Sequence, residues 1–331
     1  MSRVYRPWGM LHWVLAHCPR LEWSLLGCLS TEERCLAAWM TARNGADLSS
    51  VYLAEIIDPP SRFQPLTDER LRNRRDTFLN NGGDVADIRR HPLFARSGEI
   101  IQLVEDVITN SSGNIMLDMS CLPKRFFFPA CRLLLQSSAV KNLVVTYATP
   151  VRYSHSPLAE DFQEWRALPL FTGSTDTPEV LIVNVGHLAM GLPDQIEHGS
   201  PRMEVKLLFP FPNAPESYQL TRQFLRSVEQ NLRGAATQIK HVNGMDVSDS
   251  FDHICSLSEQ GNKRVLFAPY GPKPTSLAMC IYATLKESPV FYTQPRAYNP
   301  DYSHGIKSVN GINQVFAYCL RLEGHDFYAI T

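Results

Sequence analysis

The sequence lacks the patterns that mark most catalytic and cofactor sites. It contains no H-E-x-x-H, G-x-S-x-G, Walker or G-x-G-x-x-G pattern. It also has no group of histidines and cysteines with the spacing of metal ligands. The usual zinc-peptidase, serine-hydrolase, P-loop and dinucleotide-binding chemistries are therefore not indicated, and we expect neither a bound metal nor a cofactor.

An excess of charge of either sign is missing as well. The chain has 32 Lys and Arg residues against 33 Asp and Glu, a formal net charge of −1. Duplex nucleic acid is therefore not an expected partner, although a local basic cleft stays open. The apolar stretch 10–16 is too short for a signal peptide or a membrane span, so we expect a cytoplasmic protein with no membrane partner.

The eight cysteines never form a C-x-x-C pair. Several lie inside apolar patterns, as Cys131 and Cys280 do. This distribution indicates buried free thiols in a reducing cytosol.

Strand-like apolar runs alternate with helical patterns along most of the chain, which predicts parallel sheets covered by helices on both faces. The predicted strands are 21–29, 51–57, 84–88, 115–118 and 143–148, then 180–185, 205–209, 238–242, 265–267 and 290–293. The predicted helices are about 31–39, 68–79, 99–108, 124–136, 216–232, 251–257 and 275–285. The type of 314–322 and 327–330 is left open. We expect a lobe at 1–150, a connector at 151–177 and a second lobe at 178–331.

The two halves match at four places in the same order. Pro123-Lys124 corresponds to Pro272-Lys273 at an offset of 149 (272 − 123), and the same offset relates Cys131 to Cys280. Further on, 145–153 resembles 290–298, and 51–53 resembles 205–207. These matches favour an internal duplication, and the predicted fold class is α/β with two pseudo-symmetric Rossmann-like lobes.

The turn Asp118-Met-Ser-Cys-Leu-Pro-Lys124 follows a predicted strand and opens a predicted helix. Pro123 suits the first helical position, and Ser120 suits a helix cap. Lys124 would then reach an anion held at the helix N-terminus. The alternative is structural: Asp118 and Ser120 cap the helix, and Lys124 is a solvated first-turn residue.

Asp118-x-Ser120-x-x-x-Lys124 resembles the motif of CARF domains, the CRISPR-associated Rossmann folds. A fused pair of such lobes resembles the SAVED sensors, whose second lobe is similar to 266–269 and 290–292 here. The resemblance implies that a cyclic oligonucleotide, or a related nucleotide signal, binds in a groove between the lobes. In the second copy Phe267 and Pro269 replace the acid and the hydroxyl, and only Lys273 is kept. Either a symmetric ligand would be held unequally by the two lobes, or the ligand is not symmetric.

Other candidate ligand-binding residues lie at corresponding strand ends. Gly271 would let a phosphate approach the backbone, or it is a plain turn glycine. Ser30 and Arg34 follow the first strand of the first half, and His187 follows that of the second. Arg34 or His187 would contact phosphate or base edges, with a structural role as the alternative for His187. Tyr147 and Tyr292 are either base-stacking or core residues.

Three functions compete. The first is a sensor of a cyclic nucleotide signal in prokaryotic antiviral defence, acting through a separate effector protein or through self-assembly into a homo-oligomer. The second is a phosphodiesterase that degrades such a signal, with Lys124 and Lys273 stabilising the phosphoryl charge. The third is a scaffold without a small ligand. The lack of a recognisable general base or metal cluster argues against the enzyme.

Overall fold

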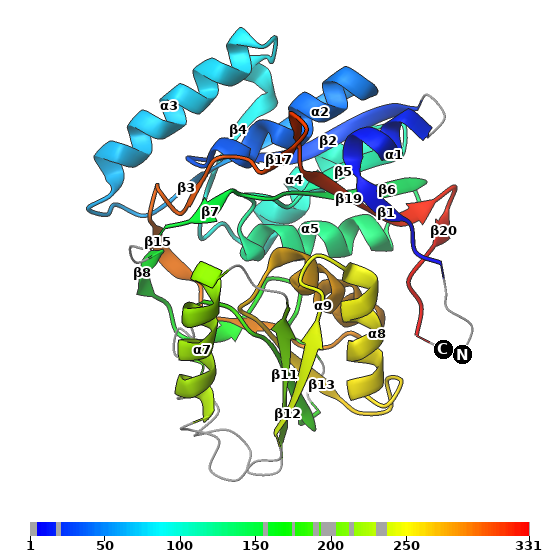
Figure 1. Ribbon diagram of the computed structural model, residues 1–331. Coiled ribbons are helices and arrows are strands. Elements are labelled where there is room, and N and C mark those ends of the chain that lie inside the picture. Colours follow the sequence, from blue (N-terminus) through cyan, green and yellow to red (C-terminus); the bar gives the residue numbers. More distant parts are fainter. Residues whose placement is uncertain are drawn as a thin grey trace. The chain divides into compact units, whose positions relative to one another are not determined.

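The computed structural model describes residues 5–17, 21–154, 158–173, 176–187, 192, 203–211, 215–229 and 237–330 (Figure 1). The chain divides into two compact units. The first unit combines Met1–Asp161 with Pro295–Phe327, and the second combines Phe162–Gln294 with Tyr328–Thr331. The sequence instead placed all of 178–331 in one lobe. The difference arises because strand β19 (Val315–Leu322) pairs with β6 (Asn142–Ala148) in the first unit.

The first unit is built on one sheet with the strand order β1-β19-β6-β5-β2-β3-β4. Its parallel strands are β2 (Glu22–Leu29), β3 (Asp47–Ile57), β4 (Ile88–Pro92), β5 (Asn114–Asp118) and β6. Strand β2 pairs in parallel with both β3 and β5. In chain order the parallel strands therefore run 3-2-1-4-5 across the sheet, which is the order of Rossmann folds.

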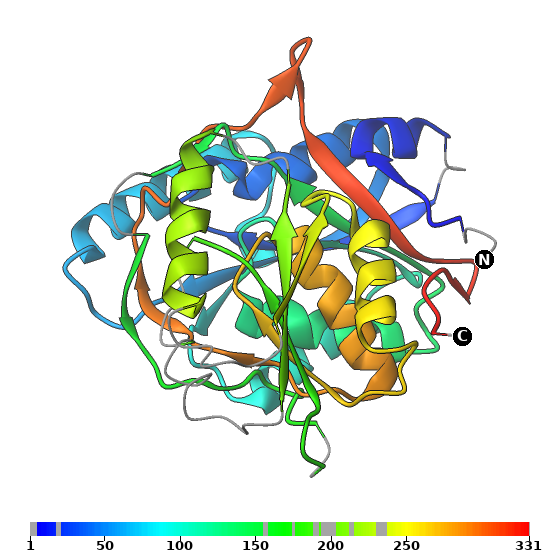
Figure 2. The same ribbon diagram turned by 60° about the horizontal axis from the view of Figure 1, so that its bottom comes forward.

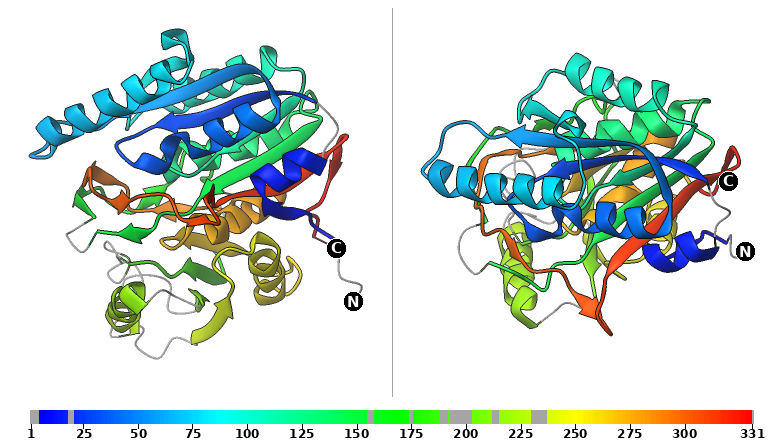
Figure 3. Two further views of the ribbon diagram at one scale, coloured as in Figure 1. Left: turned by 45° about the horizontal axis from the view of Figure 1, so that its top comes forward. Right: turned by 90° about the horizontal axis from the view of Figure 1, so that it is seen from above.

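Helices cover both faces of this sheet. The right-hand view of Figure 3 shows α2 (Ala37–Gly45) and α3 (Gln64–Asn80) on one face, with α4 (Ser97–Thr109) and α5 (Lys124–Gln136) on the other. Trp39 of α2 packs on Phe78 of α3 with ring centroids 4.6 Å apart. Every residue of β5 and β6 is buried, as expected of parallel strands that are covered on both sides.

The predicted third strand, 84–88, is displaced toward the C-terminus. Val85–Asp87 forms a 3-10 turn (η2), and β4 begins only at Ile88. Asp84 and Asp87 form a capping box, in which each side chain accepts a hydrogen bond from a backbone N–H of the turn. These local bonds compete with a strand, which explains the difference.

One side of the first sheet is antiparallel, so the expectation of purely parallel sheets is wrong there. Strand β19 runs antiparallel to β6, and β1 (Trp8–Met10) runs antiparallel to β19. The element whose type was left open, 314–322, is therefore a strand, while 327–330 is not.

Shorter elements complete the unit: α1 (Leu11–His17), η1 (Glu33–Leu36), β20 (His325–Asp326) on β19, and the antiparallel pairs β7 (Arg152–Tyr153) with β16 (Ser303–His304), β8 (Ala159–Phe162) with β15 (Pro295–Tyr298), and β17 (Ser308–Val309) with β18 (Ile312–Asn313).

The second unit has a parallel sheet with the order β12-β11-β10-β13. Its strands are β10 (Val180–Asn184), β11 (Glu204–Pro210), β12 (Thr237–Val242) and β13 (Val265–Pro269). In chain order they run 3-2-1-4, as in the first unit. Figure 2 shows α7 (Pro215–Glu229) on one side of this sheet, with α8 (Val247–Leu257) and α9 (Lys273–Lys286) on the other.

The predicted strand 290–293 is only partly a strand. Val290 forms one parallel bridge with Phe267, and β14 (Phe291–Tyr292) pairs antiparallel with β9 (Arg166–Ala167). The predicted α/β class with mainly parallel sheets is confirmed. A shared strand order is what a duplication would produce, and the duplication itself stays a prediction.

The described cysteines are free thiols, as expected. Five are buried, and Cys121 and Cys319 are half-buried. Cys18 lies outside the described residues. None of the helices in the described ranges is both long and apolar enough to cross a membrane.

Candidate functional site

The strand order reverses at one place in each sheet, between the first and the fourth strand of the Rossmann order. In the first unit these strands are β2 and β5, and in the second they are β10 and β13. Ligands of open α/β sheets bind beyond the carboxyl ends of the strands at such a reversal. The turns that the sequence singled out, 118–124 and 267–273, each follow the fourth strand of their own unit.

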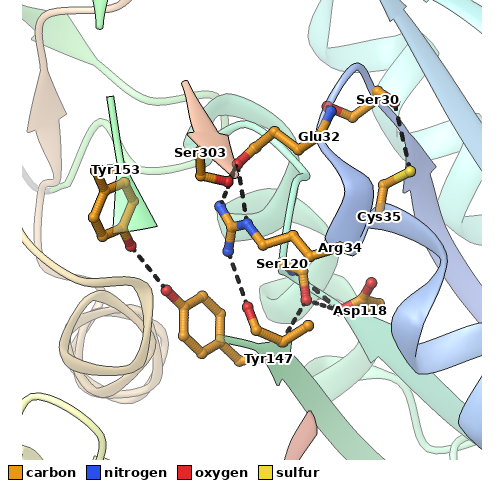
Figure 4. Close-up of polar contacts among 10 residues, drawn as sticks. Ser30, Glu32, Arg34, Cys35, Asp118, Ser120, Tyr147, Tyr153 and Ser303 are labelled. Atoms are coloured by element: carbon orange, nitrogen blue, oxygen red, sulfur yellow. Dashed lines mark hydrogen bonds and ion pairs between the residues drawn. The ribbon is translucent and has the colours of Figure 1, made fainter. Parts of the chain in front are cut away.

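In the first unit Asp118 and Ser120 form a buried hydrogen-bond network that joins the end of β5 to β6 (Figure 4). Asp118 Oδ1 accepts hydrogen bonds from Ser120 N (3.1 Å), Ser120 Oγ (2.5 Å) and Thr146 Oγ1 (3.1 Å). Ser120 Oγ in turn accepts one from Ala148 N at 2.7 Å. Ser120 is not the N-cap residue of α5, because that helix begins with Lys124 directly after Pro123. These residues hold the turn rather than the helix.

Arg34 lies in η1, just after β2, and its side chain is only 3% exposed. It forms an ion pair with Glu32 at 2.9 Å and donates to the Ala148 carbonyl at 3.1 Å. Glu32 also accepts a hydrogen bond from Ser303 Oγ. Burial is the largest single influence and lowers the pKa of Arg34, but the Glu32 carboxylate, together with Cys121, Tyr147 and Tyr153, raises that pKa well above its ordinary value. The guanidinium is thus engaged inside the first unit, at the strand end where the sequence placed a ligand contact.

Tyrosines enclose this ion pair. The Arg34 guanidinium lies over the ring of Tyr147 at 5.5 Å, and the Tyr147 hydroxyl is 3.2 Å from that of Tyr153. Tyr302 packs edge-on against Tyr153 at 5.9 Å, and burial raises the pKa values of both. Tyr147 and Tyr292 are both buried, so their alternative interpretation as core residues describes them correctly.

Ser30 belongs to the same strand end and makes local contacts. Its hydroxyl accepts from the backbone N–H of Glu32 at 3.4 Å, and its carbonyl accepts from Cys35 Sγ at 3.5 Å. Burial raises the pKa of the Cys35 thiol to about 12, so this cysteine stays protonated at neutral pH.

In the second unit the corresponding turn is held by hydrogen bonds and close packing, rather than by an ion pair between the residues described next. Asn184, fully buried at the end of β10, donates through Nδ2 to the Pro272 carbonyl at 3.0 Å and to Ser276 Oγ at 3.1 Å. A Cβ on Gly271 would lie 2.1 Å from Asn184 Oδ1, and one on Gly186 would lie 2.1 Å from the Tyr270 carbonyl oxygen. Only glycine fits where the two turns approach this closely, so Gly271 has a structural reason of its own.

His187 follows directly and is half-buried. Burial lowers the pKa of its imidazole, which favours the neutral form at pH 7. A neutral imidazole can exchange hydrogen bonds with a base or a phosphate but brings no positive charge.

The feature that the two turns share is the way their helices begin. Pro123 has φ −55° and ψ 149°, and Pro272 has φ −54° and ψ 146°. Each proline is followed by a half-buried lysine, Lys124 or Lys273, as the first helical residue. Each helix thus presents its N-terminal N–H groups, their positive partial charge and a lysine at the carboxyl end of a fourth strand.

Within the described ranges no three His, Cys, Asp or Glu side chains are grouped so as to hold a metal ion. Sequence reasoning missed the roles of Thr146 and Ser303. Ser303 meets Glu32 across 271 positions of sequence, and no local pattern predicts such a contact.

These features define an α/β protein with two sheets of Rossmann strand order. No family model and no curated protein matches the chain.

Three solved structures show weak similarity. A functionally unknown protein from Pseudomonas aeruginosa PAO1 is 12% identical with a TM-score of 0.22, over 82% of this chain and 92% of that one. A ketoreductase domain from the bacillaene assembly line is 10% identical with a TM-score of 0.22, over 80% and 61%. A keto acid-selecting NRPS module with adenylation, ketoreductase and pseudo Asub parts is 7% identical with a TM-score of 0.21, over 76% and 26%. TM-scores this low carry no argument about the present chain.

Proposed function

We propose that this chain binds a cyclic oligonucleotide or a related nucleotide second messenger as a sensor in prokaryotic antiviral defence. The output is the recruitment of a separate effector protein or the self-assembly of the chain. A cytoplasmic location, where the buried thiols stay reduced, belongs to the same proposal. No metal or cofactor is required for binding.

The observation that carries the proposal is the matched start of α5 and α9. Both helices follow the fourth strand of a Rossmann-ordered sheet, and both begin with a proline of the same backbone conformation and a lysine. A helix N-terminus offers unpaired N–H groups and a positive partial charge to an anion. A lysine beside it adds a full charge, so each turn suits a phosphate.

The other predicted residues have a supporting role in this proposal. Asp118, Ser120 and Gly271 shape the two turns through the buried contacts described above. Lys124 and Lys273 are the residues that contact the ligand. Ser30 and His187 lie at the ends of the first strands of their own units. Each would form a hydrogen bond to a base or a sugar only if the ligand extended to that first strand.

The test is titration calorimetry against a panel of cyclic di-, tri- and tetranucleotides. A charge-assisted lysine–phosphate contact contributes about 1.5–3 kcal/mol, so Lys124→Ala and Lys273→Ala should each weaken binding by roughly 10- to 100-fold. Their melting temperatures should stay close to that of the wild type. Lys141→Ala and Lys286→Ala are matched controls, because Lys141 precedes β6 and Lys286 ends α9, and both are exposed.

Equal affinity of all four variants and the wild type would overturn the proposed contacts, and a wild type that binds no panel member would overturn the function. Each mixture is also analysed by chromatography. Multiple-turnover loss of a cyclic nucleotide would replace the sensor with the phosphodiesterase alternative.

A further inference from the structure

An exposed aromatic pair lies at the carboxyl edge of the second unit's sheet. Phe211 directly follows β11 and is 57% exposed. His241, near the end of β12, is also exposed, and its ring meets that of Phe211 edge-on with centroids 6.0 Å apart. Buried Phe209 packs against the same imidazole at 5.3 Å. One exposed and one buried phenylalanine thus hold the histidine ring.

The backbone fixes the pair in place. Phe211 N donates to the Val242 carbonyl at 2.8 Å, which joins the ends of β11 and β12 directly beneath the two rings. A phenylalanine with more than half of its surface in water gains little from burial. Its location does fit a ligand, because bound molecules lie beyond the carboxyl ends of parallel strands.

The end of β11, which carries Phe211, lies close to the start of α9, although Pro210 faces α9 and the aromatic pair faces the other side of the sheet. A Cβ on Gly244 would be 3.0 Å from Pro210 Cβ and 3.8 Å from Pro272 Cγ. Pro210 precedes Phe211, and Pro272 precedes Lys273. The strands β11 and β13 are separated only by β10, so their ends are about 10 Å apart. A nucleotide or a dinucleotide spans that distance between its base and a phosphate.

The carboxylates of the same loop are engaged within it. Asp246 Oδ1 accepts from Asp249 N at 3.0 Å and caps α8. Asp249 accepts from Asn243 N at 2.9 Å and pairs with His253 at 3.6 Å. On the other side of the α9 turn, Asn184 Oδ1 is buried and has no hydrogen-bond partner among the described residues.

We infer that Phe211 and His241 stack a nucleobase of a ligand whose phosphate lies at the start of α9, next to Lys273. This inference rests on the proposed function and specifies its contacts inside the second unit. Aromatic side chains stack on any base, so the pair contributes affinity for nucleotides as a class rather than for one sequence. The ligand must therefore carry a base and a phosphate together.

The test uses a 5′-phosphorylated dinucleotide that contains 2-aminopurine, whose fluorescence is quenched on stacking. Wild-type protein should bind it with quenching. Phe211→Ala and His241→Ala should bind it about 5- to 150-fold more weakly, as expected when one stacking contact is lost. Phe211→Trp should restore binding and quenching, because tryptophan keeps a stacking face. Ile239→Ala is the matched control, since Ile239 is an exposed apolar residue on the same face of β12, two positions before His241.

The outcomes separate the two proposals. If the wild type binds the dinucleotide and Phe211→Ala binds it equally well with equal quenching, the stacking site is refuted and the proposed function stands. If wild type binds neither this probe nor any cyclic nucleotide, both are refuted. A loss for Ile239→Ala as large as for Phe211→Ala would also refute the site, because the effect would then be a general one of exposed apolar surface. Ribose 5-phosphate, which has no base, should bind the wild type and Phe211→Ala alike.

Discussion

The two units differ in the residues at the ends of their first strands. The first unit has Glu32 and Arg34 just after β2, and the second has Asn184 and Gly186 at the end of β10, the same position in the strand order. The first pair is ionic, buried and enclosed by tyrosines. The second pair is uncharged. There one turn packs directly against the other, and the Asn184 side-chain amide donates a hydrogen bond to the Pro272 carbonyl.

We infer from this difference that the carboxyl ends of the two sheets have different roles. In the first unit Glu32 and Arg34 pair with each other after β2, so these two charges have less to offer a ligand. In the second unit close packing around two glycines takes the place of the ion pair, and the aromatic pair at this edge is the base-stacking site that we propose. In the proposed function each unit still contributes a lysine, Lys124 or Lys273, and the second unit adds the aromatic pair.

The largest effect should follow from breaking the ion pair. Glu32→Ala leaves the Arg34 charge buried without its partner, and breaking a buried pair in this way costs about 3–5 kcal/mol of unfolding free energy. Urea unfolding measures the total loss. Hydrogen exchange should localise it to β2 and β6, with β10 and β13 protected as in the wild type.

Arg62→Ala is the control, because Arg62 pairs with Glu160 at the surface and is 68% exposed. Such a pair is worth about 0–1 kcal/mol. If Glu32→Ala were no more destabilising than Arg62→Ala, or if the second unit lost protection as well, the contrast between the units would be wrong.

An intermediate effect is expected in the second unit. Gly271→Ala places a Cβ against Asn184 Oδ1 and the Val185 carbonyl, so the turn must shift at a cost of about 1–3 kcal/mol. Gly98→Ala is the matched control, since Gly98 lies in α4 and a Cβ there meets nothing within 4 Å. That control should be neutral or stabilising by up to about 1 kcal/mol, because alanine favours helix. Thermal unfolding of both variants compares them, and equal melting temperatures would show that the two turns are not in close contact.

Local patterns were sufficient for many elements of this fold. The bounds 124–136 predicted for α5 match those observed, because Pro123 marks the start and the apolar run from Phe126 ends in polar residues. They failed at 84–88, where two aspartates bond to the backbone and delay the strand. They also failed at β19, because nothing in the segment 315–322 itself says that it will lie antiparallel beside β6.

The candidate site shows the same limit. The position of Lys124 at the start of a helix was predicted, whereas the helix predicted for 275–285 begins two residues earlier, at Lys273. The role of Ser120 was not predicted, because its partner Ala148 N lies on another strand, 28 positions away. The exposure of Phe211 could not be predicted from the sequence either, since a phenylalanine after an apolar strand is normally part of the core.

The smallest effect concerns the ends of the second strands, where the first unit has Asp58 and the second has Phe211. Asp58 accepts from Tyr298 N at 3.3 Å, and burial raises the pKa of its carboxyl from 3.8 to about 6. The folded state therefore holds this proton more tightly than the unfolded state. The resulting stabilisation is fully present below about pH 4, is lost as the pH rises toward 6, and is absent above that.

Asp58→Asn keeps an acceptor for Tyr298 N and removes the titration. At pH 7.5 the variant should be more stable than the wild type by about 1–2 kcal/mol, less than the full shift implies because the carboxyl is partly solvated. At pH 3.5 the two should unfold at the same urea concentration. Phe211→Leu, at the corresponding strand end of the second unit, removes no titratable group and is the comparison variant at both pH values. A stability difference for Asp58→Asn that does not change with pH, or a less stable variant at pH 7.5, would show that the Asp58 carboxyl is ionised in the folded state at no cost. The first unit would then not differ from the second in how it responds to pH at this strand end.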